Sequence, residues 1–467
     1  MLALPACLPL AEVSATDATA RLPISEPVGV LAVLAGVCAL CYYVERATRW
    51  RMFEFLPPLV FIYAIPAVLT NVGVLPAASP VREPLEQIVM PMMLVLLLLE
   101  LDVVAAMRVM GRGVGVMLFG TAGVVLGAPL GLLLVRPWLE PNAWQAFGSL
   151  AGSWVGGTAN MAAVAQAIDA GDAQRGLAVL GDTSIYLIWL PVLMASKALA
   201  VPFARWARVP VDRVASMEAA AAAIPQHNRV PTFPDYLSLL AVGLAATWVA
   251  GAAAEHLGDL TPYLSTGAWR VLLVTTLGIA LSLTPLRRIP GSRELGTALV
   301  MLFMAHMGST ADVSGIARQA VPFLLGALAW IFIHGAFCLL GARLLHVDVH
   351  TAAIASAANI GGVATASQVA AYHKQSLAPA AILMAMLGYA FGNYAGYLAA
   401  NSADLRWGHN ATVWGAPDPA GIGITARRRP HGPCAVRCLA VRIHAPWAGK
   451  CEKSGVEAGL RAPRRGA

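Results

Sequence analysis

Twelve apolar stretches, each long enough to cross or enter a lipid bilayer, constrain the fold of this chain more than any other feature. They form two sets of six on either side of a polar segment at 202–234. A membrane-spanning helix needs roughly 20 mostly apolar residues. The stretches lie at 27–44, 56–73, 87–107, 113–135, 145–168 and 176–200, and then at 235–254, 267–284, 294–309, 320–345, 351–371 and 378–400.

The composition excludes a water-soluble protein of this length. Hydrophobic residues make up 58% of the chain and charged residues only 12%, whereas an average soluble domain is about a quarter charged. The surplus of apolar side chains must therefore face lipid. We expect an all-α membrane protein that crosses the cell (inner) membrane several times.

The fifth stretch of each set carries a glycine pair. Residues 153–160 read Ser-Trp-Val-Gly-Gly-Thr-Ala-Asn, and residues 358–365 read Ala-Asn-Ile-Gly-Gly-Val-Ala-Thr. The offset is 205 residues, and Gln166 and Gln368 follow at similar distances. Small residues are common in membrane helices, but the same motif at the same ordinal place favours internal duplication, which is typical of transporters.

The placement of basic residues indicates how the stretches cross. If all twelve crossed, the Arg-rich loop at 45–51 would lie opposite the basic residues of 202–234 and of 285–293, against the positive-inside rule. If 145–168 and 351–371 enter and leave on one face, these basic segments are all cytoplasmic. Each half then has five crossings and one glycine-rich re-entrant hairpin or broken helix, so the halves are inverted repeats. Only the basic tail, placed outside, departs from the rule.

This topology divides the chain into five parts. We predict an N-terminal segment at 1–26, a first transmembrane repeat at 27–200, a cytoplasmic linker at 201–234, a second transmembrane repeat at 235–400 and a basic tail at 401–467. The tail holds 11 basic and 4 acidic residues, which accounts for the whole net charge of +7. Its richness in Pro and Gly predicts a disordered, solvated segment, and no nucleic-acid partner is expected.

The glycine pairs are candidate binding sites. Unsatisfied backbone groups at membrane depth are costly unless they line an enclosed cavity. At a hairpin tip, free N–H groups attract carboxylates and free C=O groups can ligate Na⁺; the alternative is close helix packing through small residues. The candidate substrate-binding residues are Ser153, Gly156, Gly157, Thr158 and Asn160 in the first half, and Asn359, Gly361, Gly362, Thr365 and Ser367 in the second.

Asp182 is the candidate ion-coupling residue. It lies in the apolar stretch 176–200, and an acid within a membrane segment indicates an ion or proton site by default. Thr183 and Ser184 are candidate co-ligands, and Asn393 is a neutral counterpart in the matching helix of the second half. The alternative is a solvated or capping acid near the external end of its helix. No metal site beyond a transient Na⁺ is expected.

Motifs of soluble enzymes are missing from the sequence. It contains no G-x-x-x-x-G-K-[ST] and no H-E-x-x-H, so we expect neither ATP-driven transport by this chain alone nor an enzyme, and no cofactor. Cys38 and Cys41 form a C-x-x-C inside an apolar stretch without His or Cys partners nearby. We interpret them as packing residues.

The segments 148–161 and 357–362, which carry the two glycine pairs, resemble the YjcL-like family of uncharacterised integral membrane proteins (domain of unknown function 819). The resemblance covers about 27–400. That family looks related to inverted-repeat sodium/solute symporters and cation/proton antiporters. The resemblance implies a mobile core domain, formed by the glycine pairs and the helices of Asp182 and Asn393. It also implies a scaffold containing 27–44 and 235–254, through which the protein forms a homodimer.

These observations lead to one functional hypothesis and two alternatives. The leading hypothesis is a secondary active transporter that moves a small, carboxylate-bearing solute, coupled to Na⁺ or H⁺ by alternating access. The first alternative is a monovalent cation/proton antiporter or an ion channel, although Asp182 has no acidic neighbour in its helix. The second, a membrane-embedded enzyme, would need a nucleophile or metal cluster that the scattered His and Asp residues do not suggest.

Overall fold

The computed structural model describes residues 24–413 apart from 51, 56, 77, 211–218, 220–228 and 260–263. All the regular elements in this part are helices, as the sequence predicts. Six are long and apolar enough to span a membrane, or seven if the bent pair Arg82–Leu99 and Val103–Met110 counts as one span. Pro58–Asn71 and Thr266–Ser282 are shorter apolar helices. The fold is therefore that of an all-α membrane protein.

Helices occupy each of the twelve predicted stretches. The first half contains α1 (Pro27–Thr48), α2 (Met52–Phe55), α3 (Pro58–Asn71), α4 (Arg82–Pro84), the π-helical turn η1 (Leu85–Val89), α5 (Met90–Leu99), α6 (Val103–Met110), α7 (Arg112–Val135), α8 (Trp144–Gly156), α9 (Thr158–Ala167), α10 (Asp172–Ala195) and α11 (Ala200–Ala207). The second half contains α13 (Phe233–Leu257), α14 (Thr266–Ser282), α15 (Ser292–Ser309), α16 (Val313–Leu345), α17 (Val349–Lys374) and α18 (Ala378–Val413).

Three boundaries differ from those that hydropathy predicts. The stretch 87–107 is not one helix, because α5 ends at Leu99 and Asp102 caps a new helix by accepting a hydrogen bond from the Ala105 N–H at 2.9 Å. Helix α16 begins at Val313 rather than 320. Helix α18 continues past 400 to Val413. Most of 1–26 and of the tail 401–467, and half of the linker 201–234, lies outside the described residues.

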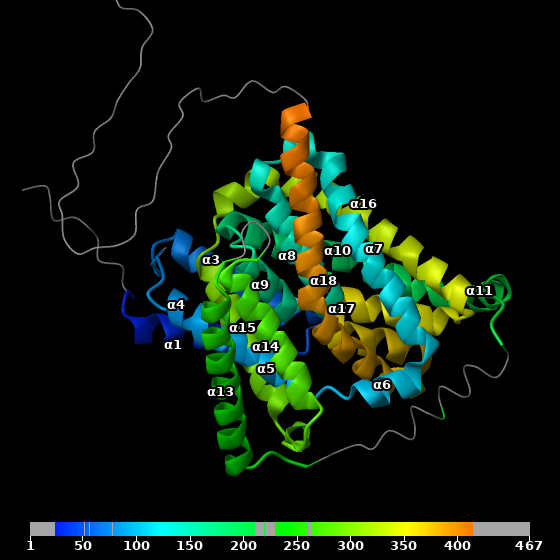
Figure 1. Cartoon of the computed structure of the whole chain (residues 1–467), viewed down its shortest axis with the longest axis horizontal. Coiled ribbons are helices and arrows are strands. Elements are labelled where there is room, and N and C mark those ends of the chain that lie inside the picture. Colours follow the sequence, from blue (N-terminus) through cyan, green and yellow to red (C-terminus); the bar gives the residue numbers. More distant parts are fainter. Residues whose placement is uncertain are drawn as a thin grey trace, which may run out of the picture. The chain divides into compact units, whose positions relative to one another are not determined.

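The helices pack as two groups, which Figure 1 allows the reader to follow. The first group, here called the core group, consists of α7, α8, α9, α10, α16, α17 and α18. The second, the scaffold group, consists of α1, α3, α5, α13, α14 and α15. The core group contains both glycine pairs, Asp182 and Asn393, and the scaffold group contains 27–44 and 235–254.

Glycines allow the main helix pairs to approach closely. In the core group, α7 and α16 meet along a stripe on α7, where a Cβ on Gly131 would lie 2.8 Å from the carbonyl oxygen of Gly326. In the scaffold group, a Cβ on Gly278 of α14 would lie 2.9 Å from Leu98 of α5. Between membrane helices, small residues of this kind replace the hydrophobic drive that holds soluble helices together.

Candidate functional site

The two glycine-pair segments are hairpins whose ends lie together. At the base of the first, Gln145 Nε2 donates to the carbonyl oxygens of Ile168 and Asp169, both at 3.3 Å. At the base of the second, the Nδ1 atoms of His350 and His373 lie 3.0 Å apart. Residues about 23 positions apart in a straight helix would be roughly 34 Å apart at 1.5 Å per residue. Each segment therefore turns back on itself, as a re-entrant hairpin does.

One glycine makes the turn in each hairpin. Gly157 has φ 78° and ψ −175°, and Gly362 has φ 63° and ψ −152°. This backbone region is essentially restricted to glycine, because a Cβ clashes there. The second glycine of each predicted pair is thus the breaking residue, while Gly156 and Gly361 end the helical limb before it.

The two turns meet. A Cβ placed on Gly157 would lie 4.0 Å from the Cα of Gly362, and a Cβ on Gly362 would lie 4.0 Å from the Cα of Gly157. Equivalent points of the two halves therefore approach each other within the core group, so closely that a methyl group added to either glycine would contact the other. The N-terminal ends of the limbs that follow, α9 and the second part of α17, start at this crossing.

Tyr389 of α18 covers the crossing, and sequence reasoning missed it. Its Cε1 atom would be 3.3 Å from a Cβ on Gly157, and its hydroxyl oxygen 3.7 Å from a Cβ on Gly362. Helix α18 can lie this close because Gly388 and Gly392 contact α8 at Val155 and Gly156. The signal in the sequence was the small-x-x-x-small spacing of Gly388, Gly392 and Gly396 around this tyrosine.

The two candidate asparagines have different surroundings. Asn160 in α9 donates from Nδ2 to the Tyr389 carbonyl oxygen at 3.0 Å, and its Oδ1 is buried without a hydrogen-bond partner among the described residues. Asn359 in α17 donates to the Met117 carbonyl oxygen at 3.0 Å and accepts from Thr121 Oγ1 at 3.4 Å. The first asparagine thus keeps an acceptor for a ligand, whereas the second is fully used by α7.

Helix α10 connects both hairpins through two polar side chains one turn apart. Ser153 of the first hairpin donates to Asp182 Oδ1 at 2.9 Å. The Tyr186 hydroxyl donates to Gln368 Oε1 of the second hairpin at 3.1 Å. Residues four apart share a helix face, so Asp182 and Tyr186 point the same way. Tyr186 is the second residue that sequence reasoning missed, although its spacing from the acid was visible.

Of the other candidates, Thr365 interacts with the Tyr186 hydroxyl on this polar face, whereas Thr183, Ser184 and Ser367 do not join it. Successive helical residues are about 100° apart, so Ser184 points away from Asp182 and Thr183 points to one side. Ser367 donates to the Val363 carbonyl oxygen of its own helix at 2.7 Å. Thr158 begins α9 beside Gly157 and is half-buried, and Thr365 is buried against Gly361.

Asn393 faces the scaffold group rather than the hairpin crossing. Its Nδ2 donates to Thr275 Oγ1 of α14 at 2.7 Å, and its Oδ1 is buried without a partner among the described residues. The residue therefore sits at the boundary between the two helix groups. Its neutral amide matches Asp182 in position along the repeat but not in neighbours.

Asp182 is an acid within a membrane helix, where a carboxylate without a basic partner is costly. It forms no ion pair with Lys, Arg or His within the described part of the chain. The same described residues contain no group of three His, Cys, Asp or Glu side chains that would hold a metal ion. The crossing thus offers one carboxylate together with amide and hydroxyl oxygens. It also offers helix N-termini, which are partly positive, and helix C-termini, which are partly negative.

These features define a class of protein: an all-α membrane protein in which glycine-broken hairpins from two related halves meet at the centre of a helical core. The chain belongs to the DUF819 family, a family of proteins of unknown function, which it matches over residues 32–404. It is also similar to the uncharacterized membrane protein YjcL of Bacillus subtilis (strain 168). The two are 28% identical over 391 residues, which cover 80% of this chain and 95% of that protein.

Proposed function

We propose that this protein is a secondary active transporter of the inner membrane that moves a small, carboxylate-bearing solute coupled to Na⁺ or H⁺. The solute occupies the hairpin crossing, and the coupling ion binds at Asp182. Transport proceeds by alternating access, as the core group moves against the scaffold group. The scaffold group is also the surface through which two copies would associate.

The close approach of Gly157 and Gly362 is the observation that supports this proposal most. Two helical limbs begin there, and the unpaired N–H groups of a helix N-terminus attract a carboxylate. The Asn160 amide adds an unpaired acceptor oxygen. A site of this kind is costly in lipid unless something uses its backbone groups, which favours a solute over simple helix packing.

The surroundings of Asp182 support ion coupling. A carboxylate inside a membrane segment without a basic partner attracts a cation or a proton. Ser153 of the first hairpin donates to Asp182 Oδ1 at 2.9 Å. An ion bound at Asp182 would therefore affect the position of that hairpin. An ion that binds one conformation more tightly shifts the equilibrium between the two conformations.

Thermal unfolding of the purified full chain tests the proposal. We expect one carboxylate or amino acid from a panel to raise the Tm by a few degrees or more in the presence of Na⁺ or at one pH, since only a ligand of the native state stabilises it. Asp182→Asn and Asn160→Ala should abolish that rise. Asp169→Asn is the matched control, because this exposed residue has φ 49°, where asparagine is well tolerated.

Two results would change the conclusion. Stabilisation by Na⁺ or pH alone, lost in Asp182→Asn, would favour the cation/proton antiporter or ion channel over the solute carrier. A rise in Tm that Asp182→Asn and Asn160→Ala leave unchanged would contradict the site.

A further inference from the structure

A groove on the scaffold group lies apart from the hairpin crossing. It has a volume of about 470 Å³ and is lined by η1, α13 and α14. This volume lies within the usual range for small-molecule sites, about 300–1,000 Å³. None of its lining residues belongs to the candidate transport site.

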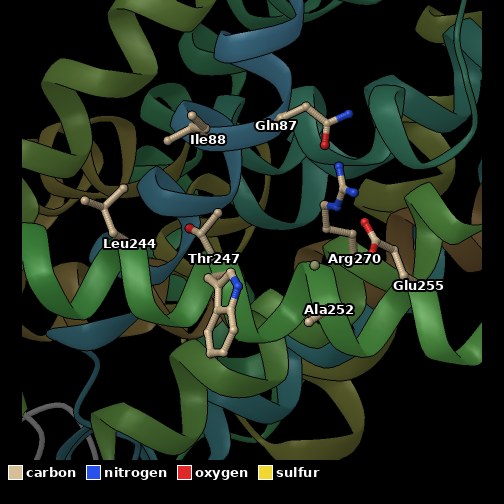
Figure 2. Close-up of a pocket in the computed structure, with 9 residues that line it drawn as sticks. Gln87, Ile88, Leu244, Thr247, Ala252, Glu255 and Arg270 are labelled. Carbon is tan, nitrogen blue, oxygen red and sulfur yellow. The ribbon is translucent and has the colours of Figure 1, made fainter.

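The groove is polar at one end and apolar at the other. Figure 2 shows Gln87, Arg270 and Glu255 gathered at one end, with Ile88 and Leu244 towards the other. Trp248 also lines it and is 74% exposed. A ligand with a polar head and an apolar chain matches this division.

The polar end lies at the edge of the membrane segment. Glu255 is in the last turn of α13, and Arg270 lies close to the start of α14. Leu244 is roughly 16 Å further along α13, at 1.5 Å per residue. This is close to the hydrocarbon depth of one leaflet, about 15 Å, because the whole core is about 30 Å thick.

The charges at the polar end select the kind of head group. Arg270 and Glu255 are the two charged residues that line the groove, and these two described residues form no ion pair with each other. The Arg270 Nε is buried without a hydrogen-bond partner in the described part of the chain. A phosphate satisfies the guanidinium, and an ammonium group satisfies the carboxylate.

We propose that this groove binds one zwitterionic aminophospholipid, phosphatidylethanolamine. Its phosphate lies against Arg270, its ammonium group against Glu255, and one acyl chain runs past Trp248 to Leu244. Phosphatidylglycerol offers the phosphate but no cation for Glu255, and phosphatidylcholine offers a cation that cannot donate a hydrogen bond. This assignment holds whether or not the protein transports a solute.

Native mass spectrometry of the purified full chain, with each of the three lipids added separately, tests the assignment. The wild type should bind phosphatidylethanolamine about tenfold more tightly than phosphatidylglycerol, the factor that corresponds to about 1.4 kcal/mol. Glu255→Gln should remove the preference by strengthening phosphatidylglycerol binding. Arg270→Gln should weaken both lipids at least tenfold.

Two further variants separate the groove from general lipid binding and from misfolding. Gly251→Leu fills the groove, because a Cβ at this position would lie 3.9 Å from the Arg270 Nε. Leucine also favours the helix, so this variant should stay folded and lose lipid binding. Glu140→Gln and Arg318→Gln alter a surface pair whose nitrogen and oxygen lie 3.8 Å apart and should change nothing.

If the three lipids bind equally, and Arg270→Gln and Gly251→Leu leave that binding unchanged, the lipid surrounds the protein without a specific site. This result would overturn the assignment. Light scattering that shows two copies per particle in the wild type and one in Gly251→Leu would also overturn it. The groove would then be an interface between copies of this chain.

Discussion

The two hairpins share a backbone turn but differ in what their side chains do. Gly157 and Gly362 adopt the same glycine-only conformation and lie close to each other. Around the first, Asn160 keeps an unpaired oxygen and Ser153 reaches Asp182. Around the second, Asn359 is held at both ends of its amide by α7. The proximity of the two halves therefore gives the site its shape. The polar groups that remain available to a ligand come mostly from the first half.

The largest effect should come from adding a methyl group at the turns. Gly157→Ala should lower stability by about 3 kcal/mol, because an alanine in this region of φ and ψ costs 1–3 kcal/mol and its Cβ would press on Tyr389 at 3.3 Å. Gly362→Ala meets its nearest atom at 3.7 Å and should cost less. Denaturation of the purified variants measures both.

Gly36→Ala is the control for these substitutions, since a Cβ there meets nothing within 4 Å. It should leave stability unchanged or improve it. If Gly157→Ala behaved like Gly36→Ala, the glycine turn would not exist in the folded protein.

The asparagines should separate stability from ligand response. Asn359→Ala removes the hydrogen bonds to the Met117 carbonyl oxygen and from Thr121 Oγ1, so it should cost about 2 kcal/mol while solute-induced stabilisation remains. Asn160→Ala should cost less and eliminate the response. The two quantities come from the same thermal unfolding series with and without ligand, and the reversed pattern would assign the binding chemistry to the second hairpin.

The bases of the hairpins should respond differently to acid. The His373 Nε2 lies 2.9 Å from the Leu193 carbonyl oxygen, so it carries the proton, and the neutral ring accepts from His350 through Nδ1. A second proton on His373 would place its Nδ1–H against the Nδ1–H of His350. Acidification towards pH 5 should therefore separate the two ends of the second hairpin. At the base of the first hairpin, the Gln145 side chain bonds to backbone groups of Ile168, Asp169 and Gly171, which do not titrate.

Hydrogen exchange, corrected for the intrinsic effect of pH, measures this difference in peptides from 144–168 and 349–374. We expect faster exchange on acidification in the second region only. His350→Ala should remove the difference between pH values, and equal acceleration in both regions would contradict this account of the bases.

The smallest effects concern two matched helix caps. Asp102 and Asp312 each accept a backbone N–H three residues on, at 2.9 and 3.0 Å, and alanine at either position should cost about 1 kcal/mol. Hydrogen bonds from the Gly315 N–H and the Ser314 hydroxyl lower the pKa of Asp312.

A lowered pKa in the folded state means that the Asp312 cap contributes fully above the ordinary Asp pKa of about 3.9. Its contribution disappears as the pH falls through the lower folded value. Asp312→Asn retains a capping oxygen and should show little loss at neutral pH. A loss as large as that of Asp312→Ala, measured by thermal unfolding, would show that the charge rather than the cap matters.

The sequence predicted the helices and the hairpins well because both depend on local signals. Apolar length marks each helix, and the repeated glycine pairs together with the basic loops indicated segments that turn back. The correspondence of Gly157 with Gly362 in the two halves followed from duplication, and the structure adds that they lie close together. The break at Glu100–Asp102 was missed because hydropathy does not register a capping aspartate inside an apolar run.

The site was predicted less well because it depends on how each helix is rotated. Tyr389 and Tyr186 are ordinary aromatic residues in the sequence, and only the orientation of α18 and α10 brings them to the hairpins. Asn393 looked equivalent to Asp182, yet α18 directs it to Thr275 of the scaffold group. Rotation is set by long-range packing of small residues, which no local pattern specifies.

Labelling of single cysteines with a membrane-impermeant maleimide tests the opposed hairpins most directly. In a chain freed of its seven native cysteines, cysteines replacing Asn142 and Asp169 flank the first hairpin, and cysteines replacing Leu344 and Gln375 flank the second. The account predicts that the first pair reacts only from one side of the membrane and the second pair only from the other. Reaction of the two members of either pair from opposite sides would contradict it.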